Sequence, residues 1–266
     1  MKRRLGRLES TLFAYAQMRK LRELRTGDLV KPLRITAKQE RELYSRLARA
    51  GMIAKVRRGL YLIPAELPLG GSWTPDDGLA LGTLLADREG RYQICGPNAF
   101  NRYGFSEQVP NRVYAYNNRL SGDRRIGAIA MTLIKVADER LGATQAWKTR
   151  DGIEVVYCSR VRTLVDAVYD WSRFNSLPRG YGWIAGELKA RRVSAAELVA
   201  ATLRYGDRGT IRRMGALLER EKAAAALLRE LENALTPSAG TIAWIPTRAK
   251  RGTLNARWGV VMNGEG

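Results

Sequence analysis

Residues 36–64 impose the strongest local constraint on how this chain can fold. Thr36 offers a hydroxyl that can cap a helix, and Leu43 and Leu47 recur at helical spacing after it. Gly51 then stands where a left-handed residue ends a helix, and two short alternating stretches follow. The segment therefore predicts one amphipathic helix followed by a two-stranded hairpin.

The polar face of this helix and the tip of the hairpin are both rich in cations. Arg57-Arg58-Gly59 forms the predicted turn. Arginines at a turn lie far from a core and are suited to phosphate oxygens or to a minor groove. A helix beside such a turn is suited to a major groove, where glutamine and arginine pair bidentately with adenine and guanine. The side chains expected to contact DNA are Lys31, Arg34, Thr36, Lys38, Gln39, Arg41, Glu42, Ser45, Arg46, Arg49, Lys55, Arg57 and Arg58.

Two roles are expected within this set. The residues expected to reach base edges or nearby phosphates are Lys38, Gln39, Glu42 and Arg46. The residues expected to position the module on phosphates are Lys31, Arg34 and Lys55. The alternative is plain solvated surface, because a helix followed by a hairpin is common and exposed cations often contact only water.

Two further helices are predicted before this segment. The first runs from Ser10 to about Leu24, and the second is GDLVKPL (27–33), whose length Pro32 limits. The order helix, short helix, turn, helix and hairpin predicts a winged helix-turn-helix in residues 1–66.

The charge of the chain indicates an anionic partner. Basic residues exceed acidic ones by 20, and the first 60 residues alone carry 17 basic and five acidic side chains. An excess concentrated in one part of a chain is typical of proteins that bind nucleic acid. A membrane surface is the competing partner, but no stretch approaches the roughly 18–20 apolar residues of a membrane span. We therefore expect a cytoplasmic protein with no membrane partner.

The composition also removes several kinds of catalysis. The chain has no histidine, which excludes histidine triads, histidine-ligated metals and imidazole acid–base chemistry. Cys95 and Cys158 lie far apart in apolar surroundings and are expected to be buried free thiols. No glycine-rich phosphate loop and no CxxC motif occurs. We expect no catalytic residue, no metal site and no cofactor.

One enzymatic alternative stays open. DNA-cleaving folds often combine an acidic residue with a downstream Glu-x-Lys, where carboxylates hold a metal and the lysine assists a water. Glu187-Leu188-Lys189 has that form, with Asp166 and Asp170 upstream. The tripeptide lies in a predicted helix rather than on a strand, so a carboxylate- and metal-dependent nuclease is the weaker alternative.

The remainder of the chain is predicted to be one mixed α+β domain. Residues 64–75 hold three prolines and two adjacent glycines, which is typical of a linker. Thr74 is expected to cap the next helix, with Pro75 at its first position. Strand and helix signals in residues 70–266 show no βαβ rhythm. The expected strands are 92–95, 112–116, 124–136, 153–158, 241–246 and 258–262, and the expected helices are 97–104, 159–171, 194–204, 210–220 and 223–235.

Three pairs of charged residues in this domain have simple expected roles. Arg162 and Asp166 lie four residues apart on a predicted helix, and such a pair contributes only a few tenths of a kcal/mol if exposed. Arg191-Arg192 and Arg212-Arg213 are expected on solvated helix faces, where they are available to a partner.

Five segments in the same order resemble one known family. They are RRGLYLIP (57–64), YQICGPNAFNRYGFSEQVP (92–110), YCSRVRTLVDAV (157–168), TIRRMGALLE (210–219) and RWGVV (257–261). With the N-terminal pattern, these segments make the chain similar to AbiEi-type antitoxins of type IV toxin–antitoxin systems over about 200 residues.

The resemblance implies two activities. It implies a transcriptional repressor whose winged helix binds inverted repeats of double-stranded DNA in its own promoter. It also implies a C-terminal antitoxin domain that counters a cognate nucleotidyltransferase-like toxin without a required stable complex. Inverted repeats imply two copies on each operator of a protein that is a monomer in solution. A DNA-binding regulator that acts without a toxin is the alternative.

Overall fold

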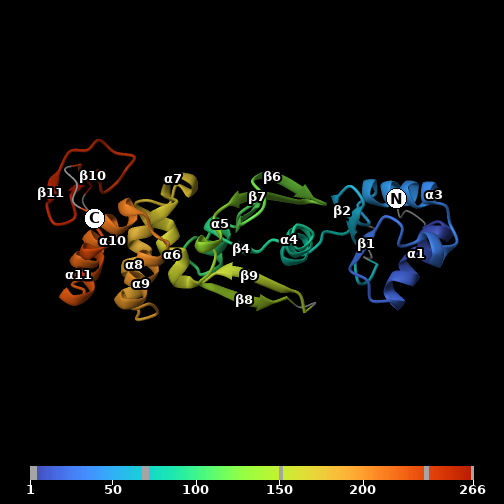
Figure 1. The fold of residues 1–266 in the computed structure, drawn as a ribbon, viewed down its shortest axis with the longest axis horizontal. Coiled ribbons are helices and arrows are strands. Elements are labelled where there is room, and N and C mark those ends of the chain that lie inside the picture. Colours follow the sequence, from blue (N-terminus) through green and yellow to red (C-terminus); the bar gives the residue numbers. More distant parts are fainter. Residues whose placement is uncertain (1–4, 68–71, 150–151, 237–239, 265–266) are drawn as a thin grey trace. The chain divides into compact units, whose positions relative to one another are not determined.

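The structure, a computed structural model, describes residues 5–67, 72–149, 152–236 and 240–264. Its fold is mixed α+β, as the sequence predicts (Figure 1). Contacts within the chain define two compact units. Unit 1 consists of Met1–Gln93, Asn111–Leu141 and Ala146–Val156, and unit 2 consists of Ile94–Pro110, Gly142–Gln145 and Tyr157–Gly266. The domain boundary predicted between residues 66 and 70 includes residues outside the described ranges and stays a prediction.

Residues 5–64 of unit 1 form what we call the N-terminal module. Strands β1, β3 and β2 make an antiparallel sheet in that order, with Leu24 and Lys55 both opposite Tyr61. Apolar residues from α1, α3 and the loops pack on one another to form the core of the module. The elements are α1 (Arg7–Met18), β1 (Glu23–Arg25), α2 (Val30–Leu33), α3 (Ala37–Arg49), β2 (Ala54–Arg57) and β3 (Leu60–Leu62).

The first helix is shorter than the sequence pattern predicts. It ends at Met18 instead of Leu24, because Lys20 adopts a left-handed conformation with φ of 54°. The Leu21 amide then donates to the Ala16 carbonyl across this turn. Leu24 is buried as expected, but it projects from strand β1 rather than from a helix. The predicted extra turn is wrong because an apolar side chain at helical spacing can be buried equally well from a strand.

The third helix begins and ends where the sequence predicts. Thr36 caps α3, and Gly51 has a φ of 68° just after the helix. Leu43 and Leu47 are fully buried. The expected hairpin is also confirmed, since β2 and β3 pair antiparallel.

Six strands among the described residues form a mixed sheet in the order β6-β7-β5-β4-β9-β8 (Figure 1). β6 pairs antiparallel with β7, whereas β5 with β7 and β4 with β9 pair in parallel. The strands are β4 (Tyr92–Ile94), β5 (Val113–Asn117), β6 (Gly122–Ile126), β7 (Ile129–Lys135), β8 (Thr144–Lys148) and β9 (Glu154–Cys158). Helix α4 (Asp77–Ala86) precedes the sheet, α5 (Gly96–Arg102) follows β4, and η1 (Asp138–Arg140) is a short 3₁₀ turn after β7.

Three details of this region differ from expectation. The single strand predicted for 124–136 is a hairpin, because Gly127 takes a left-handed φ of 58° and reverses the chain. Strand β8 was not predicted, since its exposed residues show no apolar alternation. Helix α4 is capped by Asp76, whose carboxylate accepts from the Gly78 amide, and not by Thr74.

Unit 2 consists of helices packed around α6, with a small sheet at the end of the chain. Helix α10 is buried along most of its length, and a methyl group at Gly215 would lie 2.3 Å from the Trp258 ring. The elements after β9 are α6 (Arg160–Tyr169), α7 (Trp171–Phe174), α8 (Arg179–Lys189), α9 (Ala195–Tyr205), α10 (Arg208–Arg220), α11 (Ala225–Asn233), β10 (Ile242–Ala243), β11 (Thr253–Asn255) and β12 (Val260–Met262). The small sheet has the order β10-β12-β11, and its strand β11 was not predicted.

The Arg162–Asp166 pair lies in the core of unit 2 rather than at its surface. The two side chains are 0% and 1% exposed, and Arg162 Nε donates to Asp166 Oδ2 at 2.8 Å. The Arg162 guanidinium also lies 3.8 Å from the centroid of the Tyr205 ring. Helical spacing alone does not distinguish an exposed pair from a buried one, because burial depends on which helices pack against α6.

Replacing Asp166 by Ala should lower the free energy of unfolding by about 3–5 kcal/mol, because the Arg162 charge would stay buried without its carboxylate. Urea titrations followed by tryptophan fluorescence would measure the change. Arg173→Ala is the matched control, since it removes a partly exposed pair with Asp170 and should change stability by less than about 0.5 kcal/mol. Equal losses from the two variants would contradict the structural importance of the buried pair.

Candidate nucleic-acid interface

Helix α3 begins with a reciprocal cap formed by two of the predicted contact residues. The Thr36 hydroxyl accepts a hydrogen bond from the Gln39 amide at 3.2 Å. The Gln39 side-chain carbonyl in turn accepts from the Thr36 amide at 2.8 Å. This capping box satisfies two amides of the first turn and holds the Gln39 side chain back along the start of the helix.

A buried carboxylate joins α3 to the turn that precedes α2. Glu40 is fully buried, and its two oxygens accept from the backbone amides of Gly27 at 2.7 Å and Leu29 at 2.8 Å. The Tyr44 hydroxyl, one helical turn later, donates to Glu40 at 3.4 Å or to the Arg25 carbonyl at 3.2 Å. These bonds set the position of α3 relative to α2, and burial raises the pKa of Tyr44 so that it stays protonated.

Glu40 is not among the predicted contact residues, but its position in the sequence indicates that it is buried. Residues 40, 43, 44 and 47 share one face of the helix, and the last three are buried apolar or aromatic side chains. An acid on an apolar stripe indicates a buried charge with a specific partner.

The opposite face of α3 is exposed and mainly cationic. Its residues recur at three- and four-residue spacing and therefore form one stripe along the helix. Arg49 Nε donates to the Ser45 carbonyl of its own helix, at 3.4 Å. The exposed residues of this stripe are Lys38, Arg41, Glu42, Ser45 and Arg49.

Arg46 lies at the edge of this stripe and has an internal partner. Its Nε donates to the Glu9 carboxylate at 2.8 Å. Glu9 is buried and also accepts from the Gly6 amide at the start of α1. Arg46 therefore ties α3 to α1, and its side chain would have to leave Glu9 to reach a base.

The two arginines of the hairpin have different environments. Arg57 donates from Nε and Nη2 to the two carboxylate oxygens of Asp87, at 2.6 and 2.5 Å. Asp87 follows α4, is nearly buried, and also accepts from Arg25 at 3.3 Å. The hydrogen bonds from Arg57 hold the pKa of the Asp87 carboxyl below its usual range. Arg58 is exposed, so it is the arginine of the tip that is available to a ligand.

The remaining predicted cations surround α3 on neighbouring elements. Lys31 lies in α2, Arg34 ends α2 in a left-handed conformation, and Lys55 lies on β2. All three are exposed. Among the described residues, no carboxylate forms an ion pair with Lys31, Arg34, Lys38, Arg41, Arg49, Lys55 or Arg58.

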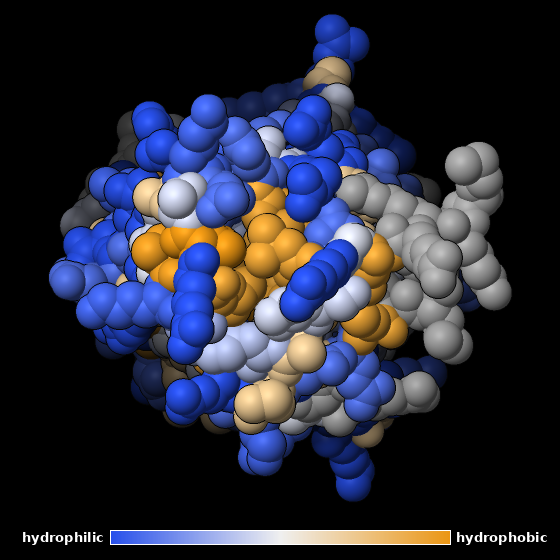
Figure 2. All heavy atoms as spheres, turned by 90° about the vertical axis from the view of Figure 1, so that its right-hand side faces the viewer, coloured by the Kyte–Doolittle hydropathy of each residue, from blue (hydrophilic) through white to orange (hydrophobic). Residues whose placement is uncertain are grey.

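Figure 2 shows one face of the N-terminal module. Hydrophilic side chains surround an apolar area on this face. Half-buried apolar side chains such as Leu8, Leu33 and Ile35 pack on the core of the module from outside. The charged groups of the module thus project around a small, partly covered core.

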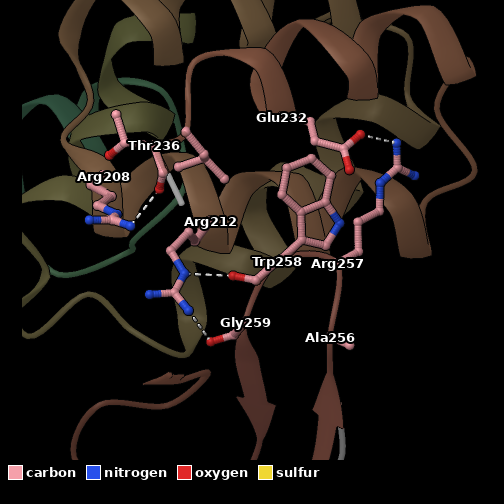
Figure 3. Close-up of a pocket in the computed structure, with 9 residues that line it drawn as sticks. Arg208, Arg212, Glu232, Thr236, Ala256, Arg257, Trp258 and Gly259 are labelled. Carbon is pink, nitrogen blue, oxygen red and sulfur yellow. Dashed lines mark hydrogen bonds and ion pairs between the residues drawn. The ribbon is translucent and has the colours of Figure 1, made fainter. Parts of the chain in front are cut away.

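Unit 2 contains a second candidate site, a pocket of about 270 Å³ (Figure 3). Arg208 donates to the Thr236 carbonyl at 2.6 Å, and Arg257 pairs with Glu232 at 2.9 Å. Arg212 donates from Nε to the Trp258 carbonyl at 2.6 Å and from Nη2 to the carbonyls of Gly240 and Gly259. These contacts tie α10 to the small C-terminal sheet, so the polar groups of this pocket serve mainly to hold the fold.

Two expectations for unit 2 are therefore corrected. Arg212 and Arg213 are not on a solvated face, since they are 7% and 8% exposed. Arg213 donates to the Ala243 carbonyl at 3.2 Å, and burial lowers the pKa of both guanidinium groups. The helix pattern could not predict this burial. The carbonyls that bind the two arginines belong to residues about 30–50 positions later in the chain, and helical periodicity does not show which segments pack against α10.

The Glu-x-Lys tripeptide lies on helix α8, as expected. Glu187 is nearly buried and accepts from Arg160 at 2.9 Å and from Arg192 at 2.7 Å. The Arg160 guanidinium also lies over the Tyr103 ring, at 4.9 Å from its centroid. Glu187 is thus engaged by two arginines. Among the described residues, no group of three acidic, cysteine or histidine side chains is arranged to hold a metal.

Comparisons with known proteins address the fold alone. No family model matches the sequence, and none of the curated proteins compared matches it. The structure is similar to the crystal structure of the RV2827C protein from Mycobacterium tuberculosis, with a TM-score of 0.59. The match covers 97% of this chain and 92% of that chain at 15% sequence identity. Within the described residues, no helix has both the length and the apolar character to cross a membrane.

Replacing Glu40 by Ala should destabilise the N-terminal module by about 2–3 kcal/mol, because the Gly27 and Leu29 amides would lose a charged acceptor. Hydrogen exchange of these two amides would report the loss locally. Glu42→Ala on the exposed face of the same helix is the control and should leave both exchange rates nearly unchanged. Unchanged protection in Glu40→Ala would show that another group holds the turn.

Proposed function

We propose that the N-terminal module is a winged helix-turn-helix that binds double-stranded DNA. The order of its elements supports this proposal. Helices α2 and α3 are joined by a short turn, and the β2–β3 hairpin follows as the wing. In such modules the second helix of the pair lies in the major groove and the hairpin contacts the backbone beside it.

The observation that carries the proposal is the set of exposed cations on these elements. Lys38, Arg41 and Arg49 lie on one face of α3 and have no carboxylate partner among the described residues. Arg58 presents a further charge at the hairpin tip. Phosphate contacts from such cations supply most of the sequence-independent affinity for DNA.

Hydrogen bonds within the protein separate the expected DNA-contact residues into those that are free to bind DNA and those that already have a partner. The stripe of Lys38, Arg41, Glu42 and Ser45 is free to meet base edges or phosphates. Gln39 and Arg46 already have intramolecular partners, and Arg57 is held by Asp87. We therefore place base reading on the first group and give the second mainly a positioning role.

The resemblance to AbiEi-type antitoxins extends this proposal to the whole chain. We propose that the protein represses its own operon at inverted repeats and counters a nucleotidyltransferase-like toxin. A monomer in solution that places two copies on each operator accords with this proposal. Neutralisation is assigned to residues outside the N-terminal module. No surface of unit 2 is singled out for it, since Arg208 and Arg212 of its pocket bind backbone carbonyls and Arg257 pairs with Glu232.

Arg58→Ala should weaken binding to any duplex and make the salt dependence of log K shallower by about 0.9, the effect of one lost phosphate contact. Arg57→Ala is the contrast and should leave the slope near that of wild type, because Asp87 already neutralises Arg57. Fluorescence anisotropy with the duplex upstream of the gene and with an unrelated duplex would measure both. A wild-type slope for Arg58→Ala would remove the wing from the interface.

Co-expression with the product of a neighbouring nucleotidyltransferase-like gene tests the antitoxin activity. The full chain should restore growth and repress a promoter reporter. A variant with Arg41→Ala and Arg58→Ala should lose repression and keep rescue, because neutralisation is assigned elsewhere. Point substitutions are preferable to removal of residues 1–66, since unit 1 continues to Gln93. Repression without rescue by the full chain would leave a DNA-binding regulator only.

A further inference from the structure

A basic groove lies beside the C-terminal end of α3, within unit 1. Its volume is about 660 Å³. Residues from three segments, 48–55, 72–74 and 125–128, line it. They bring Arg125 of β6 to the same place as Arg49 of α3 and Lys55 of β2. Trp73, from the segment before α4, forms part of its wall. The first two cations already belong to the candidate interface, whereas Arg125 comes from the six-stranded sheet.

Specific contacts hold the walls of this groove together. The Trp73 amide donates to the Gly51 carbonyl at 2.8 Å, which attaches the segment before α4 to the end of α3. At the β6–β7 turn, a methyl group on Gly127 would lie 3.2 Å from Ala54 Cβ and 3.4 Å from Pro75 Cδ. The turn therefore packs directly on β2. The cations are presented by a preformed surface rather than by a free hairpin.

The charge of the groove is uncompensated. Arg49, Lys55 and Arg125 are all exposed, and none of the described residues that line the groove is acidic. Over the described part of the chain, none of the three has a carboxylate partner. Like charges gathered at one site repel, and an anion that binds between them relieves this repulsion.

Two neighbouring arginines of β6 lie on opposite sides of the strand, because successive side chains of a strand point to opposite faces. Arg125 lines the groove. Arg124 does not, and its Nη1 donates to the Asp123 carbonyl at 2.8 Å. The chain thus contains a matched pair of exposed arginines, one inside the groove and one outside it.

We propose that this groove binds the phosphate backbone of the same DNA duplex that α3 contacts. The β6–β7 hairpin is then a contact element next to α3 and the wing, with Arg125 as its phosphate ligand. This inference rests on the proposed DNA binding. Arg49, which lines the groove, is the last residue of α3. A DNA strand that contacts α3 would therefore continue from Arg49 past Lys55 to Arg125.

Anisotropy titrations of the full chain with an unrelated labelled duplex would test the proposal between about 50 and 200 mM salt. Arg125→Ala should make the slope of log K against log salt shallower by about 0.9. The affinity ratio of wild type to variant should therefore fall about 3.5-fold over this range. Arg124→Ala should keep the wild-type slope, and Arg125→Lys should also keep it because the charge is retained.

The outcomes separate this inference from the function on which it rests. A wild-type chain that binds no duplex would overturn both. Binding by wild type with the same slope for Arg125→Ala and Arg124→Ala would overturn the groove proposal and leave DNA binding by α3 intact. A shallower slope for Arg125→Ala that Arg125→Lys restores would support the proposal. Circular dichroism melting curves would confirm that all three variants are folded.

Discussion

The buried carboxylate of Glu40 is the interaction on which the candidate interface depends. It accepts from two backbone amides before α2 and thereby determines where α3 lies relative to the shorter helix. A charge in that position is costly to bury unless its oxygens are satisfied, so the geometry of the turn and the helix must agree. The cationic stripe of α3 faces outward because Glu40 fixes the opposite face of the helix against the turn before α2.

Arginine has two distinct uses in this chain. Where a guanidinium is buried, it meets a carboxylate, as Arg162 meets Asp166, or backbone carbonyls, as Arg212 does at the C-terminal sheet. Arg41 and Arg49 on α3, Arg58 at the hairpin tip and Arg125 in the groove are exposed and have no carboxylate partner among the described residues, whereas the exposed Arg46 pairs with Glu9. A high net charge therefore does not by itself mark an interface. The proposed DNA contact rests instead on the exposed cations that have no carboxylate partner among the described residues.

Much of the local structure could be predicted from short-range rules. The cap at Thr36, the end of α3 at Gly51 and the β2–β3 hairpin all follow from side-chain chemistry within a few residues. The extra helical turns expected after Met18 fail for the opposite reason. Leu24 fits the helical period equally well from a strand, and only pairing with β3 decides between the two.

The sequence alone was enough to predict a mixed α+β chain with an amphipathic helix, a basic hairpin and a concentration of charge in its first quarter. Tertiary structure decided which charges are available. Asp87 reaches Arg57 across 30 residues, and Arg125 joins Arg49 and Lys55 in one groove although it lies 76 and 70 positions after them in the chain. Ion pairs and desolvation depend on distances between side chains in space, and helical or strand periodicity specifies those distances only within one element.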